Sequence, residues 1–417
     1  MGTINTGDTA FILVSTALVF FMTPGLALFY GGMVKRKNIL STIMASFFIA
    51  GLASVLWVLI GYSLSFGKDI AGIVGNFDWV LFRGVTGEPN ADYAATIPHT
   101  LFAAFQMMFA IITPALITGS LVERMKFSAL FTFIGLWSLI VYYPLAHMMW
   151  GVGGILRNLG AIDFAGGNVV HISSGVSGLV AAIILGKRKG HGITSSQPHN
   201  LPLVFIGSAV LWFGWFGFNA GSALGSGALA VHALLTTNTS AATAMLSWMF
   251  VEKITRGKPT MLGAATGAVV GLVAITPGAG FVPIWASLII GAAVSPVCYF
   301  AMSVIKPKFG YDDALDAFGC HGIGGIWGGI ATGIFAQKSI NSAAKWDGLF
   351  FGETKLFVAQ LISIGVTIAL AIVGTAVIMF ILKAVMKDIR VTPREEAEGL
   401  DISQHGESAY PSFSGMD

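Results

Sequence analysis

Between Lys355 and Lys383 the chain runs Leu356-Phe-Val-Ala-Gln-Leu-Ile-Ser-Ile-Gly-Val-Thr-Ile-Ala-Leu-Ala-Ile-Val-Gly-Thr-Ala-Val-Ile-Met-Phe-Ile-Leu382 without one charged side chain. A helix of about 20 apolar residues crosses the hydrocarbon core of a bilayer, so this stretch can span a membrane. The whole chain shares this character, because 55% of its 417 residues are hydrophobic and 10% are charged. A soluble domain carries roughly 25% charged residues. The sequence therefore predicts an integral membrane protein.

Ten more apolar stretches precede this one, which predicts an all-α polytopic membrane protein with eleven transmembrane helices. The first basic residue, Lys35, follows the first stretch, so the N-terminus lacks the positive start of a signal peptide. We therefore expect a retained first helix. The eleven expected helices cover approximately residues 8–33, 39–66, 98–121, 127–147, 168–186, 200–224, 229–251, 261–277, 283–305, 317–337 and 353–386.

Charge placement predicts the orientation of the chain. Most of its 23 Lys and Arg residues follow odd-numbered stretches, and positive loops stay in the cytosol. The N-terminus is therefore expected outside and the C-terminus inside, which requires an odd number of crossings. Residues 1–386 are expected to form the membrane domain, with halves at about 8–190 and 200–337 and a last helix at 353–386. Residues 387–417 are polar and are expected to form a cytosolic tail.

Composition also excludes several classes of protein. The net charge is +3, and no basic tract with interleaved aromatic residues indicates a nucleic-acid partner. Cys298 and Cys320 both lie in apolar stretches, which makes a disulfide framework or a zinc site improbable. We expect no cofactor and no bound metal.

Two histidines lie inside apolar stretches, where an ionisable residue is costly and therefore a functional candidate. His171 occurs in Asn168-Val-Val-His-Ile-Ser-Ser-Gly and His321 in Phe318-Gly-Cys-His-Gly-Ile-Gly-Gly, and each follows an aspartate, Asp163 or Asp313, by eight residues. If the first ten helices are two halves of five, the halves are inverted, and such repeats place a site at the midplane. The histidines could share a proton and face a pore. The alternative is two buried histidines bonded to helix carbonyls.

Aromatic residues supply a second candidate site. In the sixth stretch Trp215, Phe218 and Ser222 fall on one helical stripe, while Gly214, Gly217, Gly221 and Gly225 form the adjacent stripe for packing. Phe105 and Phe109 share a face of the third stretch, and Trp150 follows the fourth. Each alone is typical of a core or an interfacial belt. Together they indicate a vestibule for a small hydrogen-bonding cation, since aromatic faces attract cations by about 0.5–2 kcal/mol.

Several other residues have a structural interpretation. Asp163 precedes Phe-Ala-Gly-Gly at the expected start of the fifth helix, which favours a helix cap over a cation ligand. Asp312, Asp313 and Asp316 are expected to act similarly before the tenth helix. Two small-residue ladders predict close helix packing; they are Gly263, Gly267 and Gly271, and Gly325, Gly329 and Gly333.

The motifs together resemble the ammonium transporter family (Amt/Mep/Rh), over almost the whole chain. The similarity is carried by Pro24-Gly-Leu-Ala-Leu-Phe-Tyr-Gly-Gly, Ala146-His-Met-Met-Trp, Leu159-Gly-Ala-Ile-Asp-Phe-Ala-Gly-Gly-Asn-Val-Val-His, Pro198-His-Asn-Leu-Pro, Gly214-Trp-Phe-Gly-Phe-Asn-Ala-Gly-Ser, Asp316-Ala-Phe-Gly-Cys-His-Gly and Gly399-Leu-Asp-Ile-Ser-Gln-His-Gly-Glu-Ser-Ala-Tyr. The resemblance implies a plasma-membrane homotrimer with one pore per subunit and ammonium or ammonia as substrate, and it implies no enzymatic activity.

The resemblance also implies roles for the candidate residues. Phe105, Phe109, Trp150 and Ser222 would form an external recruitment site. Phe109 and Phe218 would form a gate, Trp215 would line the pore, and His171 and His321 would be a twin-histidine pair. Asp163 would hold the vestibule. The tail would be regulatory and would meet a PII-type signalling protein.

Three alternatives remain at this point. A Rhesus-type ammonia gas channel is the nearest, although Trp150 and Ser222 favour the ammonium-recruiting branch. An ammonium sensor would signal through a docked cytosolic partner, because the tail is too short for a domain of its own. A metal enzyme would need a third ligand, and no H-E-x-x-H pattern is present. The sequence leaves the transported species open.

Overall fold

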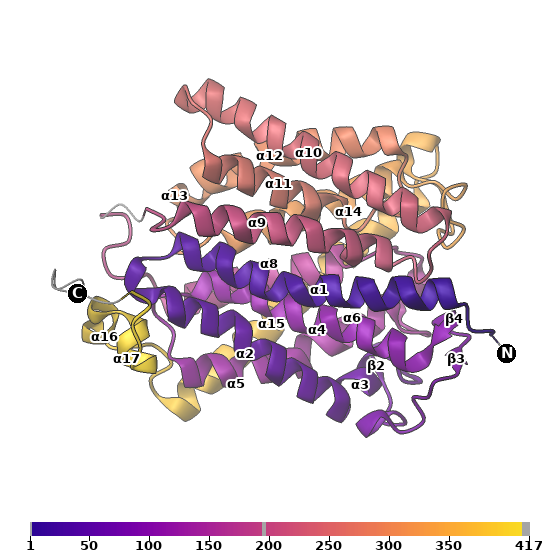
Figure 1. Ribbon diagram of the computed structural model, residues 1–417, viewed down its shortest axis with the longest axis horizontal. Helices are drawn as coiled ribbons and strands as arrows, with labels where there is room; N and C mark the ends of the chain where they lie inside the picture. Colours follow the sequence, from indigo (N-terminus) through magenta and orange to yellow (C-terminus); the bar gives the residue numbers. More distant parts are fainter. Residues whose placement is uncertain (1, 194–196, 411–417) are drawn as a thin grey trace.

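The computed structural model describes residues 2–193 and 197–410, and most of them are helical (Figure 1). The α-helices are α1 (Thr6–Met33), α2 (Ile39–Leu56), α3 (Tyr62–Phe66), α4 (His99–Leu121), α5 (Phe127–Trp137), α6 (Tyr143–Trp150), α7 (Ile155–Leu159), α8 (Ser173–Leu185), α9 (Leu201–Trp215), α10 (Ala228–Arg256), α11 (Met261–Ile275), α12 (Ile284–Phe300), α13 (Lys306–Phe309), α14 (Ile323–Phe335), α15 (Lys355–Met386), α16 (Pro393–Glu398) and α17 (Leu400–His405).

Six π-helical turns join or open these helices. They are η2 (Trp57–Gly61), η4 (Ser138–Tyr142), η5 (Gly167–Ile172), η6 (Phe216–Ala220), η7 (Ala301–Ile305) and η8 (Phe318–Gly322). The remaining short elements are the 3₁₀ turns η1 (Arg36–Asn38), η3 (Val80–Phe82) and η9 (Leu349–Phe351) and the strands β1 (Asp69–Ile70), β2 (Val74–Gly75), β3 (Pro89–Asn90) and β4 (Ala94–Pro98). Single π turns are rare and are frequent at functional sites.

The π turns combine the helices into eleven rods within the described residues, one for each expected stretch. Eight rods are long and apolar enough to cross a membrane; the other three are α10, α11 and η8–α14. Local caps start several of them. Asn5, for example, accepts a hydrogen bond from the backbone N–H of Asp8, and Thr260 accepts one from Gly263. Such caps satisfy the free N–H groups of a first helical turn.

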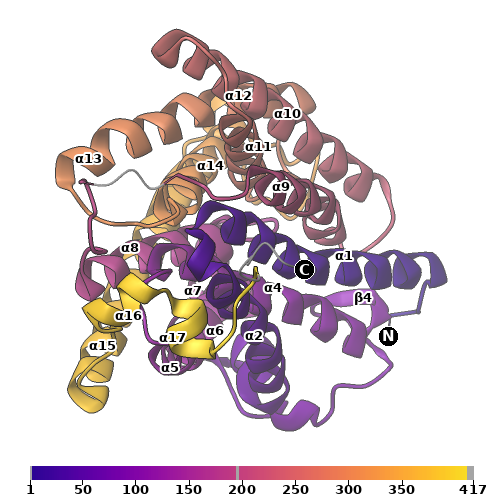
Figure 2. The ribbon, with the colours of Figure 1, turned by 60° about the vertical axis from the view of Figure 1, so that its left-hand side comes forward.

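The first helices of the two predicted halves, α1 and α9, lie side by side in the middle of the molecule (Figures 1 and 2). Their contact depends on glycine. A Cβ on Gly207 would lie 2.3 Å from the backbone nitrogen of Phe29, and one on Gly214 would lie 2.2 Å from Cγ of Met22. The predicted glycine stripe of the sixth stretch therefore faces α1. Between helices in lipid no hydrophobic force drives association, so the van der Waals contacts of such a close approach hold the helices together.

The segment between the second and third expected helices, residues 67–97, has structure of its own. It forms two antiparallel strand pairs, β1–β2 and β3–β4. Aromatic rings fix it to the bundle, since Trp79 stacks on Tyr62 with ring centroids 5.3 Å apart and Tyr93 stacks on Phe102 at 5.2 Å. These contacts join residues far apart in sequence, so local patterns did not reveal them.

The tail folds back on the bundle at the end opposite the N-terminus (Figure 1); we call this the tail end. The backbone N–H of Leu400 donates to Asn38, and Asp401 accepts from the N–H of Ser41, both at 2.8 Å. The ring of His405 meets the ring of Phe127 edge-on. Residues 411–417 of the expected tail lie outside the described residues.

Candidate functional site

Each candidate histidine lies in a π turn that follows an aspartate. Asp163 accepts hydrogen bonds from four consecutive backbone N–H groups, those of residues 166–169, at 2.6–3.2 Å. These bonds fix the start of η5, which carries His171. Asp313 accepts from the N–H groups of residues 317 and 318 at 3.2 and 2.8 Å and so fixes η8, which carries His321. The two halves therefore use the same local construction.

Close backbone packing brings the two π turns together. A Cβ on Gly175 would lie 2.2 Å from the backbone nitrogen of Gly322, so α8 reaches η8 without an intervening side chain. The rings of His171 and His321 are stacked, with centroids 5.3 Å apart and planes 19° apart. Both histidines are buried.

The ring nitrogens of this pair are available for a ligand. Nδ1 and Nε2 of His171 and Nδ1 of His321 are buried and have no hydrogen-bond partner among the described residues. Within residues 2–193 and 197–410, neither ring bonds to a helix carbonyl, and no hydrogen bond joins the rings to each other. A buried polar atom without a partner is costly, so this geometry favours a role in binding over a structural role.

Aromatic side chains continue the path from the histidines. Trp215 stacks on His171 with ring centroids 5.4 Å apart and donates its indole N–H to Thr276 at 2.9 Å. Phe218 lies 6.1 Å from His171, measured between ring centroids. It also lies 5.3 Å from Trp215 and 4.5 Å from Phe109, the shortest of these ring separations.

The row ends at an outer cavity of about 300 Å³. Trp150 meets Phe109 edge-on at 6.0 Å, and Phe105 meets Phe109 at 5.1 Å. Trp150 donates its indole N–H to the backbone carbonyl of Asp163, and the hydroxyl of Ser222 donates to the carbonyl of Phe218. The oxygen of this hydroxyl keeps its lone pairs for a donor ligand.

A second, much smaller cavity of about 10 Å³ is lined by His171, His321, Trp215 and Phe218. Roughly 10–15 Å³ is needed to hold one water molecule, so this cavity admits nothing larger than a single small molecule. Phe109 lines the outer cavity and Phe218 the inner one, and their contact separates the two.

The described structure thus brings all the candidate aromatic, hydroxyl and histidine residues into one row. The prediction that Ser222 shares a stripe of one regular helix with Trp215 and Phe218 was wrong. The regular helix α9 ends at Trp215, η6 follows, and Ser222 lies beyond η6. The side chain reaches the cavity because the π turn changes the helical spacing that the sequence interpretation assumed.

Sequence reasoning missed Gln106, which lines the outer cavity between Phe105 and Phe109. Its side-chain oxygen is buried and has no partner among the described residues. An amide in an apolar stretch was the signal that could have identified it. At the tail end, a further cavity of about 230 Å³ is lined by Asp316 and Cys320, among others.

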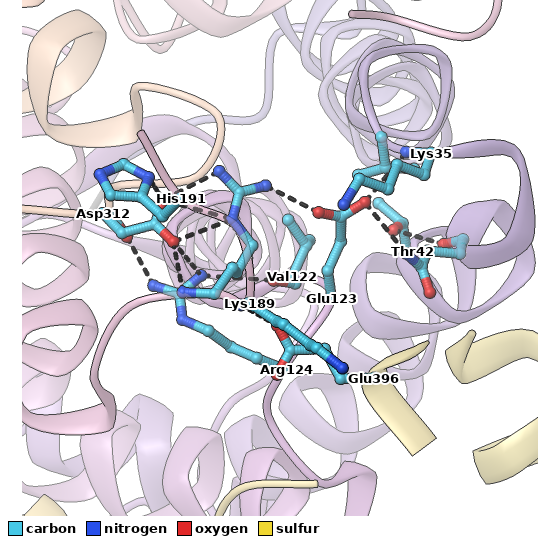
Figure 3. A network of polar contacts seen from close by, with 12 residues as sticks. Lys35, Thr42, Val122, Glu123, Arg124, Lys189, His191, Asp312 and Glu396 are labelled. Atoms are coloured by element: carbon cyan, nitrogen blue, oxygen red, sulfur yellow. Dashed lines mark hydrogen bonds and ion pairs between the residues drawn. The ribbon is translucent and has the colours of Figure 1, made fainter. Parts of the chain in front are cut away.

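The expected helix caps Asp312 and Asp316 have other partners. Asp316 pairs with Lys306 at 2.7 Å. Asp312 belongs to a polar network at the tail end (Figure 3), where Arg188 bridges it, at 2.8 Å, to Glu123, at 2.7 Å. Cationic side chains, Lys306 of α13 for Asp316 and Arg188 of a distant loop for Asp312, thus replaced the local backbone that the sequence interpretation assigned to both carboxylates.

Burial acts against the charge on the carboxylates of this network. It raises the pKa of Asp312, but the hydrogen bond from Arg188 and the charge of Arg124 outweigh it, and the pKa is lowered. Burial likewise raises the pKa of Glu123, but the charge of Arg188 and hydrogen bonds from Lys35 and Asn38 outweigh it, and the pKa is lowered. Both groups are therefore charged at neutral pH.

No group of three or more His, Cys, Asp or Glu side chains in the described part of the chain is arranged to hold a metal ion. The site is built instead from aromatic faces, a hydroxyl group and two imidazole rings. Such groups suit a small ligand that donates hydrogen bonds and is drawn to aromatic rings.

Comparison with known proteins finds similar sequences and structures over nearly the full length of the chain. Residues 10–410 match the model of the Ammonium Transporter Family. The "Ammonium transporter" of Bacillus subtilis (strain 168) is 54% identical over 404 residues, 97% of this chain and 98% of that protein. The crystal structure of Saccharomyces cerevisiae Mep2 superposes with a TM-score of 0.90 at 35% identity, covering 99% of this chain and 93% of that one. A structure described as "Sensor Amt Protein" gives a TM-score of 0.87 at 29% identity, covering 96% and 98%.

Proposed function

Because the chain belongs to the Ammonium Transporter Family, we propose that it recruits ammonium at the outer cavity and passes it, or ammonia, along the row of aromatic and histidine side chains. It is a polytopic all-α membrane protein, as its sequence predicted, and a transporter rather than an enzyme. The observation that carries the proposal is the continuous row from Trp150 through Phe109 and Phe218 to His171 and His321.

Recruitment is the first step of the proposal. Trp150 and Phe109 line the outer cavity, with Phe105 packed against Phe109, and a cation near such aromatic faces gains about 0.5–2 kcal/mol. The oxygen of Ser222 accepts one hydrogen bond from the ammonium ion, and the side-chain oxygen of Gln106 is available as a second acceptor after a rotamer change. This weak binding concentrates ammonium without trapping it.

Passage through the gate is the second step. The contact between Phe109 and Phe218 separates the cavities, so the rings must move apart for the permeating molecule. The inner cavity, of about 10 Å³, has no room for a hydration shell, and a bare cation in an apolar site is penalised by several kcal/mol or more. Transfer as neutral ammonia removes this penalty.

The histidines are the third step. Ring nitrogens without protein partners can accept a hydrogen bond or a proton from the permeating molecule. Potassium is close to ammonium in size, but it neither donates hydrogen bonds nor loses a proton. The pair therefore selects by chemistry rather than by radius. Either ammonia passes while its proton travels along the histidines, or the rings only shape the path.

Currents from proteoliposomes test this function. Purified protein on a solid-supported membrane should give a transient current after an ammonium pulse and none after a potassium pulse. Trp150→Leu combined with Ser222→Ala should raise the half-saturating ammonium concentration by about tenfold, the loss of roughly 1.4 kcal/mol of recruitment. Equal currents for both ions, or an unchanged half-saturation in the double variant, would refute the recruitment site.

The family also guides proposals about assembly. We propose a homotrimer with one pore per subunit in the cell membrane, the N-terminus outside and the tail in the cytosol. Residues 1–386 form the transporting domain and 387–417 a regulatory tail that a PII-type protein contacts. The placement of α16 and α17 against the loops at the tail end supports the tail assignment.

A sensor is the second candidate function, favoured by the similarity to the "Sensor Amt Protein". Such a protein would bind ammonium and signal through a partner docked at the tail end. Full-length protein should then retain a soluble partner during purification, whereas a chain truncated at about residue 390 should lose it. Retention without ammonium currents would favour the sensor, and currents without retention would favour the transporter. The aromatic vestibule with Trp150 and Ser222 argues against a Rhesus-type gas channel.

A further inference from the structure

A pocket of about 540 Å³ lies at the tail end, away from the row of aromatic and histidine side chains. Its walls come from the end of α8 and from the turn that η7 and α13 form. The lining is mostly apolar and includes Leu179, Ala182, Ile183, Ile305, Phe309 and Phe318. We call it the α8–α13 pocket.

The pocket faces the surroundings of the bundle. Ile183 is 59% exposed and Phe309 is 74% exposed, and both belong to rods that are long and apolar enough to cross a membrane. The adjacent end of α8 carries Lys187 and Arg188, where a span ends at the charged headgroup layer. The pocket therefore lies at the boundary between acyl chains and headgroups.

Two lysines near this boundary lack a counter-charge. Lys187 lines the pocket, and its Nζ lies 3.3 Å from the point that a Cβ on Gly310 would occupy. Lys308 lies on α13 beside Phe309. Both are exposed, and neither has an acceptor among the described residues, whereas the neighbouring Lys306 is paired with Asp316.

The carboxylate in the pocket wall does not neutralise these lysines. Asp312 lines the pocket, but its oxygens are held by Arg188 at 2.8 Å, by Arg124 at 3.9 Å and by the ring of His191 at 3.2 Å. The rim is therefore positive, and the interior is apolar. This combination matches an amphipathic anion.

We propose that the α8–α13 pocket binds one anionic phospholipid of the leaflet at the tail end. One acyl chain lies against the apolar wall, and the ammonium groups of Lys187 and Lys308 contact the headgroup phosphate. Basic pockets between membrane helices bind anionic headgroups in this way. A zwitterionic lipid offers the same chains, but its own cation opposes the lysines. A free phosphate would gain nothing from the apolar wall.

The site has a structural link to the pore. Phe318 lines the pocket and opens η8, the π turn that carries His321. A bound chain therefore packs against the start of this turn. The proposal does not depend on the transported species or on transport itself, because its test measures binding.

Native mass spectrometry of delipidated, full-length protein in detergent tests the proposal. Titration with phosphatidylglycerol and with phosphatidylcholine of the same acyl chains should show the first phosphatidylglycerol binding about thirtyfold tighter, since two lysines at roughly 1 kcal/mol each contribute about 2 kcal/mol. Lys187→Gln combined with Lys308→Gln should abolish this preference. The exposed pair Lys253→Gln and Lys258→Gln, at the end of α10, is the matched control and should keep it.

Further arms separate the occupants. Phe309→Ser, at an exposed position, should weaken both lipids by removing part of the apolar wall. Inorganic phosphate at millimolar concentration should not displace phosphatidylglycerol. The proposal would be overturned if the Lys187/Lys308 double variant preferred phosphatidylglycerol as strongly as the Lys253/Lys258 control does. Displacement of phosphatidylglycerol by phosphate would overturn it too. A change of oligomeric state in Phe309→Ser would also overturn it, since the pocket would then be an interface with a second copy.

Discussion

At the residue scale, the proposed function rests on side chains whose polar atoms are left without protein partners. Buried ring nitrogens of His171 and His321 and the oxygen of Gln106 all lack hydrogen bonds within the described chain. In a folded protein such atoms are rare because each costs about 1–3 kcal/mol. Asp163 is the opposite case, since both its oxygens are saturated by backbone N–H groups.

Replacing His171 tests the role of the ring nitrogens. We expect His171→Ala to lower the ammonium-evoked current by about a hundredfold if the ring carries a proton, or to admit potassium if it only shapes the cavity. Proteoliposome currents with both ions measure this. His232→Ala is the control, because His232 bonds to the carbonyl of Val282 outside the row. Unchanged flux and unchanged potassium rejection would show that His171 has neither role.

Replacing Asp163 tests the cap of η5. Asp163→Ala leaves four buried N–H groups without an acceptor, and we expect it to lower the free energy of unfolding by about 2–4 kcal/mol. Asp163→Asn keeps one carbonyl oxygen and should lose less. Thermal unfolding of the purified protein, followed by tryptophan fluorescence, compares the two. The idea fails if the alanine variant is as stable as the wild type.

At the element scale, π turns and glycines position the site. The turns η5 and η8 carry the two histidines, and η6 carries Phe218. Each turn shifts the helical spacing and so redirects the side chains that follow. Glycines then let the redirected turns meet, as Gly175 does at Gly322. The ladder glycines act similarly, with Gly267 against α10 and Gly325 against His171 and Ile172.

A single methyl group tests this packing. Gly175→Ala places a Cβ 2.2 Å from the backbone nitrogen of Gly322, which cannot move like a flexible side chain. We expect a loss of about 1–3 kcal/mol of stability together with a reduced ammonium current. Gly365→Ala is the matched control on α15, where a Cβ would meet no atom within 4 Å, and its higher helix propensity should make it neutral or stabilising. Equal melting temperatures for the two variants would contradict the packing argument.

At the scale of the whole molecule, the two halves meet through α1 and α9 and are joined at the tail end by charge. Arg188, at the end of the first half, bridges Glu123 to Asp312 in the second half (Figure 3). The tail meets this network, since the backbone N–H of Lys189 donates to Glu396, which also pairs with Arg390. The tail therefore contacts the residue that follows Arg188 in the chain.

Removing the bridge should destabilise the fold. Arg188→Met leaves buried Glu123 without its cation and leaves Asp312 with only Arg124, at 3.9 Å, and the ring of His191, and we expect a loss of about 3–5 kcal/mol at pH 7. Thermal unfolding in detergent measures it, with Arg83→Met as the control, an exposed arginine of the outer loop. Equal melting temperatures for these two variants would refute the bridge.

The pH dependence follows from the lowered pKa values of Glu123 and Asp312. A carboxylate whose pKa is lower in the folded state stabilises the fold above its unfolded pKa, roughly 4, and this stability is lost as the pH falls toward the folded pKa. Wild-type protein should therefore lose stability below about pH 4. Arg188→Met should lose less over the same range, because Arg188 contributes to lowering both pKa values. A steeper acid loss in the variant would contradict this assignment.

The sequence by itself determined the membrane class, the eleven helices and the residue types of the site. Apolar length and charge are local properties, and lipid enforces them segment by segment. The motifs around Trp150, Trp215 and the two histidines then indicated the family, which the full-length match confirmed.

Only the tertiary structure decided which of these residues meet. The stacking of His171 on His321 depends on a backbone approach at Gly175, and the partners of Asp312 and Asp316 come from other segments. The π turns replaced the regular spacing assumed for Ser222, and the buried oxygen of Gln106 became apparent only inside the outer cavity. Contacts between distant segments, and the burial they create, have no local signature along the chain, so the ring contacts that make up the row, including that between Phe109 and Phe218, appear only in three dimensions.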